Sequence, residues 1–136
     1  MGPLDHRTIR AGYNFNNPLK IHNHPSPESI KPLLSSFSID GATNLVIDCV
    51  KRGEDDDDVS LGELPKRKGR SVIVRIFDSL GGKSKGHLRW GSIPIKKAWK
   101  TNVLEDDLEE IKIEKDGTGI EVEVRAFEVA TYRLQL

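Results

Sequence analysis

The sequence predicts an all-β protein, an antiparallel β-sandwich of about seven or eight strands. Short runs of alternating apolar and polar residues recur along the chain, and glycine- and aspartate-containing turn signals separate them. No stretch carries a sustained helical stripe of apolar residues. Short strands with frequent turns are typical of two antiparallel sheets packed face to face. We expect the sandwich to occupy residues 32–136, behind an irregular, extended N-terminal arm over residues 1–31.

The most strongly patterned stretch, residues 70–82, predicts a central strand. Its middle is almost entirely apolar and β-branched, and such residues fit a pleated sheet because their stiff side chains lose little freedom there. Val72, Val74 and Ile76 share one wholly apolar face, while the opposite face is mixed. A glycine pair at 81–82 ends the strand in a turn.

Two shorter strands are expected upstream, over residues 33–39 and 44–52. A turn signal at 40–41 separates them and favours a hairpin. In the second strand, alternation places Leu45, Ile47 and Cys49 on one face. Cys49 is the sole cysteine of the sequence and has apolar neighbours, so we expect a buried, inert thiol.

Residues 53–69 form a polar loop with two blocks of opposite charge. Four adjacent aspartates at 55–58 repel one another, so we expect a mobile, solvated insertion rather than a packed segment. A calcium loop is not expected, because the run lacks alternating oxygen ligands with a glycine and a distal glutamate.

Downstream of the central strand, alternation resumes over residues 85–100. It places Leu88 and Trp90 inward, and Trp99 is expected to pack in the core rather than to stack on a sugar ring. The turn at 115–119 favours another hairpin. Over the last stretch the alternation changes phase, which predicts bulges or a bend near Ala126 and Ala130 and a crossing from one sheet to the other.

The composition excludes several classes of function. Lys plus Arg (21) equals Asp plus Glu (21), so no broad electrostatic attraction to nucleic acid or to an anionic membrane is expected. No signal peptide or spanning helix is evident, which favours an intracellular protein. No nucleophile elbow, phosphate loop or zinc-protease motif occurs. His22 and His24 are expected to be solvated, so we predict no metal in this chain.

Four stretches carry a family resemblance through their order and spacing. They are Tyr-Asn-Phe-Asn-Asn-Pro-Leu at 13–19, Asn-Leu-Val-Ile-Asp-Cys-Val-Lys-Arg-Gly-Glu at 44–54, Ser-Val-Ile-Val-Arg-Ile-Phe-Asp-Ser-Leu-Gly-Gly at 71–82 and Ala-Phe-Glu-Val-Ala-Thr-Tyr-Arg-Leu at 126–134. Together they resemble the C-terminal β-domain of class II α-mannosidases, glycoside hydrolase family 38, of the cytosolic or fungal vacuolar type. The sequence departs from the family pattern in Asp78, where glutamate is commoner, and in the loop at 55–68.

The resemblance implies what the whole protein does. The family enzyme hydrolyses terminal α-linked mannose in oligosaccharides with retention, using two carboxylates and a divalent metal, usually zinc. It also implies that these groups belong to an N-terminal catalytic domain. We therefore expect this chain to be inactive alone and to hold no catalytic residue or cofactor. Its expected role is to brace the catalytic domain, and a second expected role is to form part of the wall of the substrate cleft. Its partners would be that catalytic domain and, as the substrate of the whole enzyme, the oligosaccharide. The resemblance is also compatible with a whole enzyme that is homo-oligomeric and lies in the cytoplasm or the vacuole.

Six polar residues are candidates for contact with the cleft or the domain interface. They are Asn14, Asn16, Asn17, Lys51, Arg52 and Glu54. They lie in the arm and at a strand end, where a sandwich presents loops to a partner; ordinary solvated loop residues are the alternative.

Two other functions stay open, namely an independent carbohydrate- or protein-binding module and a small stand-alone enzyme. An excised domain should expose an apolar patch that involves Tyr13, Phe15 or Leu19, whereas a free module should not.

Overall fold

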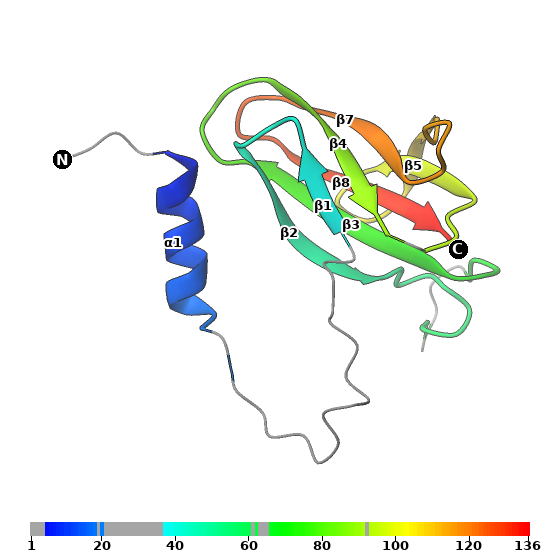
Figure 1. Cartoon of the computed structure of the whole chain (residues 1–136). Helices are drawn as coiled ribbons and strands as arrows, with labels where there is room; N and C mark the ends of the chain where they lie inside the picture. The colour runs from blue at the N-terminus through cyan, green and yellow to red at the C-terminus, as the bar shows by residue number, and fades with distance from the viewer. Residues whose placement is uncertain (1–4, 19, 21–36, 61, 63–65, 92) are drawn as a thin grey trace, which may run out of the picture.

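Two antiparallel sheets pack face to face in the computed structural model (Figure 1), which describes residues 5–18, 20, 37–60, 62, 66–91 and 93–136. The elements of these residues are α1 (His6–Asn16), β1 (Phe37–Asp40), β2 (Leu45–Arg52), β3 (Ser71–Asp78), β4 (Ser84–Trp90), β5 (Lys97–Thr101), β6 (Asp107–Ile111), β7 (Gly119–Val124) and β8 (Val129–Gln135). The predicted all-β sandwich is confirmed.

The two sheets differ in width. The smaller has the strand order β1-β4-β7, and the larger has the order β2-β3-β8-β5-β6. Strand β3 is paired with β2 on one side and β8 on the other, so the predicted central strand is confirmed. All strand pairs are antiparallel, which suits sheets with one face on the core and the other toward the outside.

The core lies between the sheets and follows the predicted alternation. Val74 and Ile76 of β3 are buried in it with Leu88 and Trp90 of β4, and the fully buried Val122 of β7 faces them. Burying a side chain of this size stabilises the fold by about 1.5–3 kcal/mol. The indole of Trp90 also donates to the carbonyl of Gly117 over 3.0 Å, so its polar atom is satisfied at the edge of the core.

Trp99 is not in this core, contrary to expectation. It lies opposite Arg133 of β8, on the face of the larger sheet that points away from the smaller sheet, here called the outer face. Its ring is half-buried, and the ammonium of Lys97 lies 5.9 Å from the ring centroid. Side chains alternate between the two faces along β5, and Ala98 points inward, so the neighbouring Trp99 points outward.

The predicted hairpin between β1 and β2 is wrong, because β1 pairs with β4 and the chain then crosses to the other sheet. Asn44 holds this crossing in place. Its side-chain amide donates to Asp78 at 2.5 Å, on the larger sheet, and to Ser84 at 2.7 Å, on the smaller. One asparagine therefore ties the ends of both sheets together, which a local turn signal does not reveal.

A register shift between Ile47 and Cys49 corrects the predicted faces of β2. The extra residue, Asp48, forms a bulge, and a bulge reverses the alternation beyond it. Val50 therefore joins Leu45 and Ile47 on the inner face, while Cys49 pairs with Arg75 on the outer face and is half-buried. The prediction that Cys49 shares the face of Leu45 is wrong.

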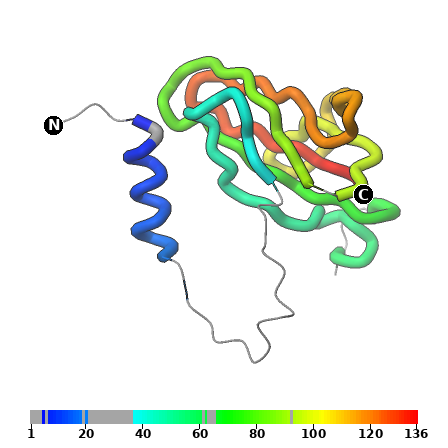
Figure 2. The backbone as a smooth tube through the Cα atoms, viewed as in Figure 1, coloured from blue at the N-terminus to red at the C-terminus, as the bar shows by residue number. Residues whose placement is uncertain are grey.

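The predicted crossing near the C-terminus is confirmed, since β7 belongs to the smaller sheet and β8 to the larger (Figure 2, orange to red). The break is a tight turn at 125–128, in which Phe127 has a φ of 56° and Glu128 donates to the carbonyl of Arg125. The expected irregularity at Ala130 is absent, because the pairing of β3 with β8 runs without a shift from Phe77 to Ser71.

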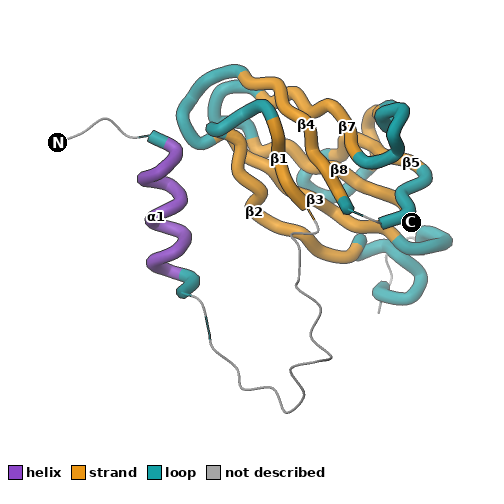
Figure 3. Tube along the Cα trace, in the orientation of Figure 1, coloured by secondary structure: helices purple, strands orange, loops and turns teal. Residues whose placement is uncertain are grey.

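The arm contains a helix, so the expectation of an irregular, extended segment is wrong for His6–Asn16 (Figure 3). Asp5 caps the helix, because its carboxylate accepts the backbone N–H of Arg7 at 2.9 Å and of Thr8 at 3.2 Å. The prolines that argued against a helix all lie outside it. The predicted contact Leu19 and residues 21–31 lie outside the described residues.

Helix α1 has few contacts with the sandwich. The hydroxyl of Tyr13 donates to Asp48 over 3.3 Å, and Ile9 and Tyr13 line a shallow hollow with Phe77 of β3. The described helix is too short and too polar to cross a membrane.

Candidate functional site

The six predicted residues fall into two separate groups. Lys51, Arg52 and Glu54 lie together where β2 ends. The three asparagines lie in and just after α1, and two of their side chains are used locally. Asn16 donates to the carbonyl of Gly12 at 2.9 Å, and Asn17 donates to that of Tyr13 at 3.4 Å. The structure therefore does not bring the arm residues to the β2 residues.

The β2 residues belong to a group of paired charges centred on the buried Arg133, which we call the Arg133 cluster. Its other members are Lys51, Arg52, Glu54, Asp55, Asp56, Asp58, Arg67, Ser71, Glu105 and Asp107. The cluster covers one end of the outer face, where the chain segments at 53–60 and 102–107 fold over β3 and β8. These segments also bury Ile73 completely, although it points away from the core.

Arg133 is the fully buried centre of the cluster. Its Nη1 donates to Asp55 at 2.7 Å and to the hydroxyl of Ser71 at 3.0 Å, and its Nη2 donates to the carbonyl of Glu105 at 2.8 Å. Its Nε lies 3.1 Å from Asp107, an ion pair that is not aligned as a hydrogen bond. A buried guanidinium needs this number of acceptors, because an unpaired buried charge is very costly.

Asp56 is also completely buried, so the expectation that the aspartate run is solvated and cannot pack is wrong at this position. Its carboxylate accepts the backbone N–H and the hydroxyl of Ser71, both at 2.7 Å, and pairs with Arg52 at 3.0 Å. Arg52 also pairs with Asp58 at 2.6 Å. The repulsion within the run is relieved because Asp55 faces Arg133 and Arg67, whereas Asp56 and Asp58 share Arg52.

Gly53 makes this arrangement possible. A Cβ at this position would lie 2.3 Å from the hydroxyl oxygen of Ser71 and 2.8 Å from Nη1 of Arg133. Any side chain would therefore displace the buried groups of the cluster. The glycine after β2 is required by close packing and not by an unusual φ.

Lys51 closes the cluster at its rim. It pairs with Glu105 at 2.6 Å and with Glu54. Glu105 has a φ of 71°, which is unfavourable for a residue with a side chain, and its carboxylate also accepts the backbone N–H of Glu54 at 3.1 Å. These bonds hold the 102–106 loop against the sheet.

The cluster favours the ionised forms of Asp55 and Lys51. Burial alone would raise the pKa of Asp55, but hydrogen bonds from Arg133 and Arg67 outweigh it and lower this pKa below its usual value. Partial burial would lower the pKa of Lys51, but its hydrogen bonds to Glu105 and Glu54 raise it. A general acid needs a carboxyl pKa raised toward neutrality, so Asp55 is poorly suited to acid catalysis.

The described residues contain no group of three or more His, Cys, Asp or Glu side chains that could hold a metal ion. The carboxylates of the Arg133 cluster face cations instead, as in the pairs of Asp55 with Arg133, Asp56 with Arg52 and Asp107 with Arg67. The cluster therefore does not fit a zinc ion, and its ion pairs and hydrogen bonds hold the segments at 53–60 and 102–107 on the sheet.

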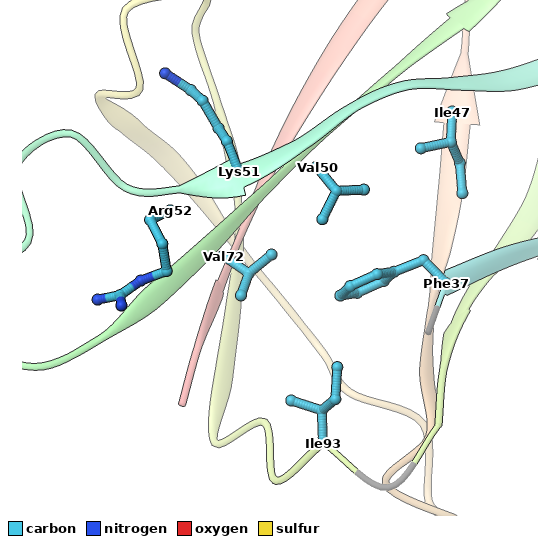
Figure 4. A pocket seen from close by; sticks show the side chains of 7 residues that line it. All are labelled: Phe37, Ile47, Val50, Lys51, Arg52, Val72 and Ile93. Atoms are coloured by element: carbon cyan, nitrogen blue, oxygen red, sulfur yellow. The ribbon is translucent and has the colours of Figure 1, made fainter. Parts of the chain in front are cut away.

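Two grooves adjoin the cluster. One, of about 890 Å³, lies on the outer face beside Arg75 and the 102–106 loop. The other, of about 650 Å³, lies between the edge strands β1 and β2 (Figure 4). In Figure 4, Phe37, Val50, Val72 and Ile93 point toward one another across this second groove, whereas the charged ends of the two neighbouring basic residues point away.

The sequence reasoning missed most of the cluster, notably Arg133, Asp56, Glu105 and Asp107. Two signals were present. Arg133 lies in the otherwise uncharged final strand, and the loop at 53–69 carries blocks of opposite charge that can pair with each other and with the sheet. Neither signal shows which cation meets which carboxylate, because the partners lie up to 78 positions apart.

Comparison with known proteins gives two matches. The glycosyl hydrolases family 38 C-terminal beta sandwich domain matches residues 64–132. A protein of Saccharomyces cerevisiae called alpha-mannosidase is 30% identical over 146 aligned positions, which cover 98% of this chain and 13% of the yeast protein. The chain thus spans only a small part of the length of this relative. Its sequence, its two-sheet architecture and both matches agree, and the chain belongs to glycosyl hydrolase family 38, as its C-terminal β-sandwich domain.

Proposed function

We propose that this domain is a non-catalytic structural part of an α-mannosidase. In this proposal the whole enzyme hydrolyses terminal α-linked mannose in oligosaccharides with retention, and the β-sandwich braces the catalytic domain. The name of the yeast relative and the family match support the activity. Walling of the substrate cleft is the second role that we propose for the domain.

The observation that carries the bracing role is an apolar region exposed on the outer face. Val103 is 67% exposed, Leu104 79% and Val129 56%. Val129 lies opposite Phe77 on the outer face, and Val103 lies close to Arg75 of the same face, because its carbonyl accepts a hydrogen bond from Arg75 at 3.4 Å. Apolar side chains gathered on one face are typical of a surface that another domain covers.

The arm adds apolar surface of its own, as the sequence suggested. Phe15 is 85% exposed and Tyr13 is 39% exposed. Because α1 touches the sandwich through few residues, we include it among the parts of this chain that the catalytic domain would order.

The catalytic groups belong, in this proposal, to the preceding domain. A retaining glycosidase uses one carboxylate as nucleophile and a second as acid and base. The carboxylates of the buried Asp56 and the half-buried Asp55 and Asp107 face guanidinium groups, which supports a structural role for them. Zinc or another divalent metal would be bound by the catalytic domain, and the enzyme would act in the cytoplasm or the vacuole.

Activity assays test the absence of catalysis. We expect the purified chain to release no product from an aryl α-mannoside, with or without added zinc, and the full-length protein to release it. Hydrolysis by the chain alone would contradict the proposal. Binding of a mannose oligosaccharide by the chain alone, measured by calorimetry, would support an independent carbohydrate-binding module instead.

Truncation tests bracing. The full-length protein is compared with a form that ends just before this chain, and the melting temperature and the aryl α-mannosidase activity of both are measured. We expect the shortened form to melt at a lower temperature and to lose activity on mild heating. Equal melting temperature and equal heat resistance would rule out the bracing role.

A further inference from the structure

Arg75 is one of the residues that line the groove of about 890 Å³ on the outer face. Arg75 projects from β3 between Cys49 of β2 and Thr131 of β8 and is half-buried. Among the described residues it forms no ion pair. Its guanidinium donates one long hydrogen bond, of 3.4 Å, to the carbonyl of Val103, and its buried Nε has no hydrogen-bond partner among the described residues.

The neighbouring arginines behave differently. Arg52, Arg67 and Arg133 each pair with at least two carboxylates. The nearby carboxylate of Glu54 is itself paired with Lys51. The part of the Arg75 guanidinium that lines the open groove can therefore accept an ion-pair partner supplied from outside.

The wall of the same groove presents two apolar side chains on a rigid loop. The side-chain oxygen of Asn102 accepts the backbone N–H groups of Leu104 and Asp106, each at 2.9 Å, and Glu105 fixes the loop end with its positive φ. Val103 and Leu104 are therefore held in solvent by a fixed backbone. A preorganised loop loses little conformational entropy on binding, which favours its use as a docking element.

Arg75, Val103 and Leu104 line this groove, together with Asp106 and with charged residues of the Arg133 cluster that are paired with one another. We propose that this groove, here called the Arg75 groove, receives a segment of the catalytic domain of the same polypeptide. The segment carries an aspartate or glutamate that pairs with Arg75, and apolar side chains beside it pack on Val103 and Leu104. This inference rests on the proposed function. We assign the preceding polypeptide because the matching family domain is a C-terminal one and this chain aligns with only 13% of the yeast relative, which leaves a large remainder as the nearest partner.

Association in trans tests the inference. The 136-residue chain and the polypeptide that precedes it in the full-length gene are produced separately, and their dissociation constant is measured by calorimetry at two salt concentrations. The variants are Arg75→Met, which keeps the apolar stem, and Leu104→Ser. The matched controls are Arg125→Met and Leu80→Ser, which remove an exposed arginine and an exposed leucine at positions outside the groove.

We expect the Arg75→Met and Leu104→Ser variants to bind at least about tenfold more weakly than the unchanged chain, and each control to bind within about twofold of it. Arg75→Met should also reduce the salt dependence of binding, because it removes an ion pair. All four variants should keep the melting temperature of the unchanged chain, which excludes unfolding as the cause.

Three results would count against these ideas, and they can be told apart. If the unchanged chain binds but the groove variants bind equally well, the Arg75 groove is not the docking site and the proposed function stands. If the controls weaken binding as much as the groove variants do, the contact is not specific to the groove and the inference is overturned. If the unchanged chain does not bind at all, the bracing role and the inference both fail.

Discussion

Single residues decide how charge is accommodated on the outer face of the larger sheet. Arg133 is buried among carboxylates, and breaking such a pair by removing one partner commonly costs about 3–5 kcal/mol because the other charge stays buried. The neighbouring Gly53 contributes by its lack of a side chain, since the space that a Cβ would take belongs to Ser71 and Arg133.

Replacing Gly53 by alanine is expected to destabilise the domain by about 2–3 kcal/mol, because the added methyl group forces buried polar groups apart. Urea unfolding followed by circular dichroism measures this. Gly82→Ala is the matched control, because a Cβ there meets nothing within 4 Å, and it should change stability by less than about 0.5 kcal/mol. Equal stability of the two variants would show that the cluster can expand without cost.

Asp78 has a comparable structural role at the opposite end of β3. Its carboxylate accepts the N–H groups of Gly81 at 2.7 Å and of Phe127 at 2.9 Å, together with the amide of Asn44. It thereby joins the turn after β3 to the turn before β8. Burial would raise the pKa of Asp78, but the hydrogen bond from the backbone of Phe127 and those from Asn44, Leu80 and Gly81 lower it.

Asp78→Asn is expected to destabilise the domain by about 2 kcal/mol, because an amide NH₂ would face backbone donors that now point to a carboxylate oxygen. Thermal unfolding at neutral pH measures the effect. Asp57→Asn, an exposed change in the aspartate run, is the control and should leave the melting temperature almost unchanged. An equal effect of both substitutions would mean that the bonds of Asp78 contribute nothing in particular.

At the scale of elements, the segment at 53–60 is attached to the sheet mainly through ionised carboxylates. The pKa of Asp55 is lowered, as described above, and the pKa of Asp58 is lowered chiefly by its hydrogen bond from Arg52. A carboxyl group whose pKa is lower in the folded state stabilises that state above its unfolded pKa and loses this contribution as pH falls through the folded value.

Acidification should therefore detach this segment before the core unfolds. The loss is expected to begin below about pH 5 and to be complete only below the lowered pKa values of these aspartates. Backbone amide NMR signals of Asp57, Val59 and Ser60 follow the segment, and that of Val74 in β3 serves as the reference. Simultaneous loss of all four signals would show that the segment and the core unfold as one unit.

The elements also show where periodicity is a sufficient guide. Strand β4 and the inward face of β7 follow the predicted alternation over their whole length, and β3 follows it from Val74 to Asp78, whereas Ile73 is buried on the outer face. The bulge at Asp48 and the crossing after Gly41 could not be predicted, because both depend on contacts with residues that are distant in the sequence. Helix α1 was missed because it is short and mostly polar, and only Ile9 and Tyr13 mark one apolar face at helical spacing.

At the scale of the whole molecule, the sandwich is expected to be independent of the helix that precedes it. Among the described residues, one exposed hydrogen bond joins them, from Tyr13 to Asp48, beside the hollow at Phe77. Deleting residues 1–18 should therefore change the free energy of unfolding by about 1 kcal/mol or less. Differential scanning calorimetry of the shortened and unchanged chains measures this, and a large fall in melting temperature would contradict it.

The sequence alone was sufficient for the fold class, for the central strand and for the family, because each of these depends on local alternation or on the order of short stretches along the chain. It also singled out Lys51, Arg52 and Glu54. The tertiary structure decided that these residues belong to the Arg133 cluster, that Asp56 is packed rather than solvated, and that Arg75 is left without an ion-pair partner among the described residues. The physical reason is that the attraction between charges depends on their distance in space, and residues far apart in the chain come close to one another only once both sheets have formed.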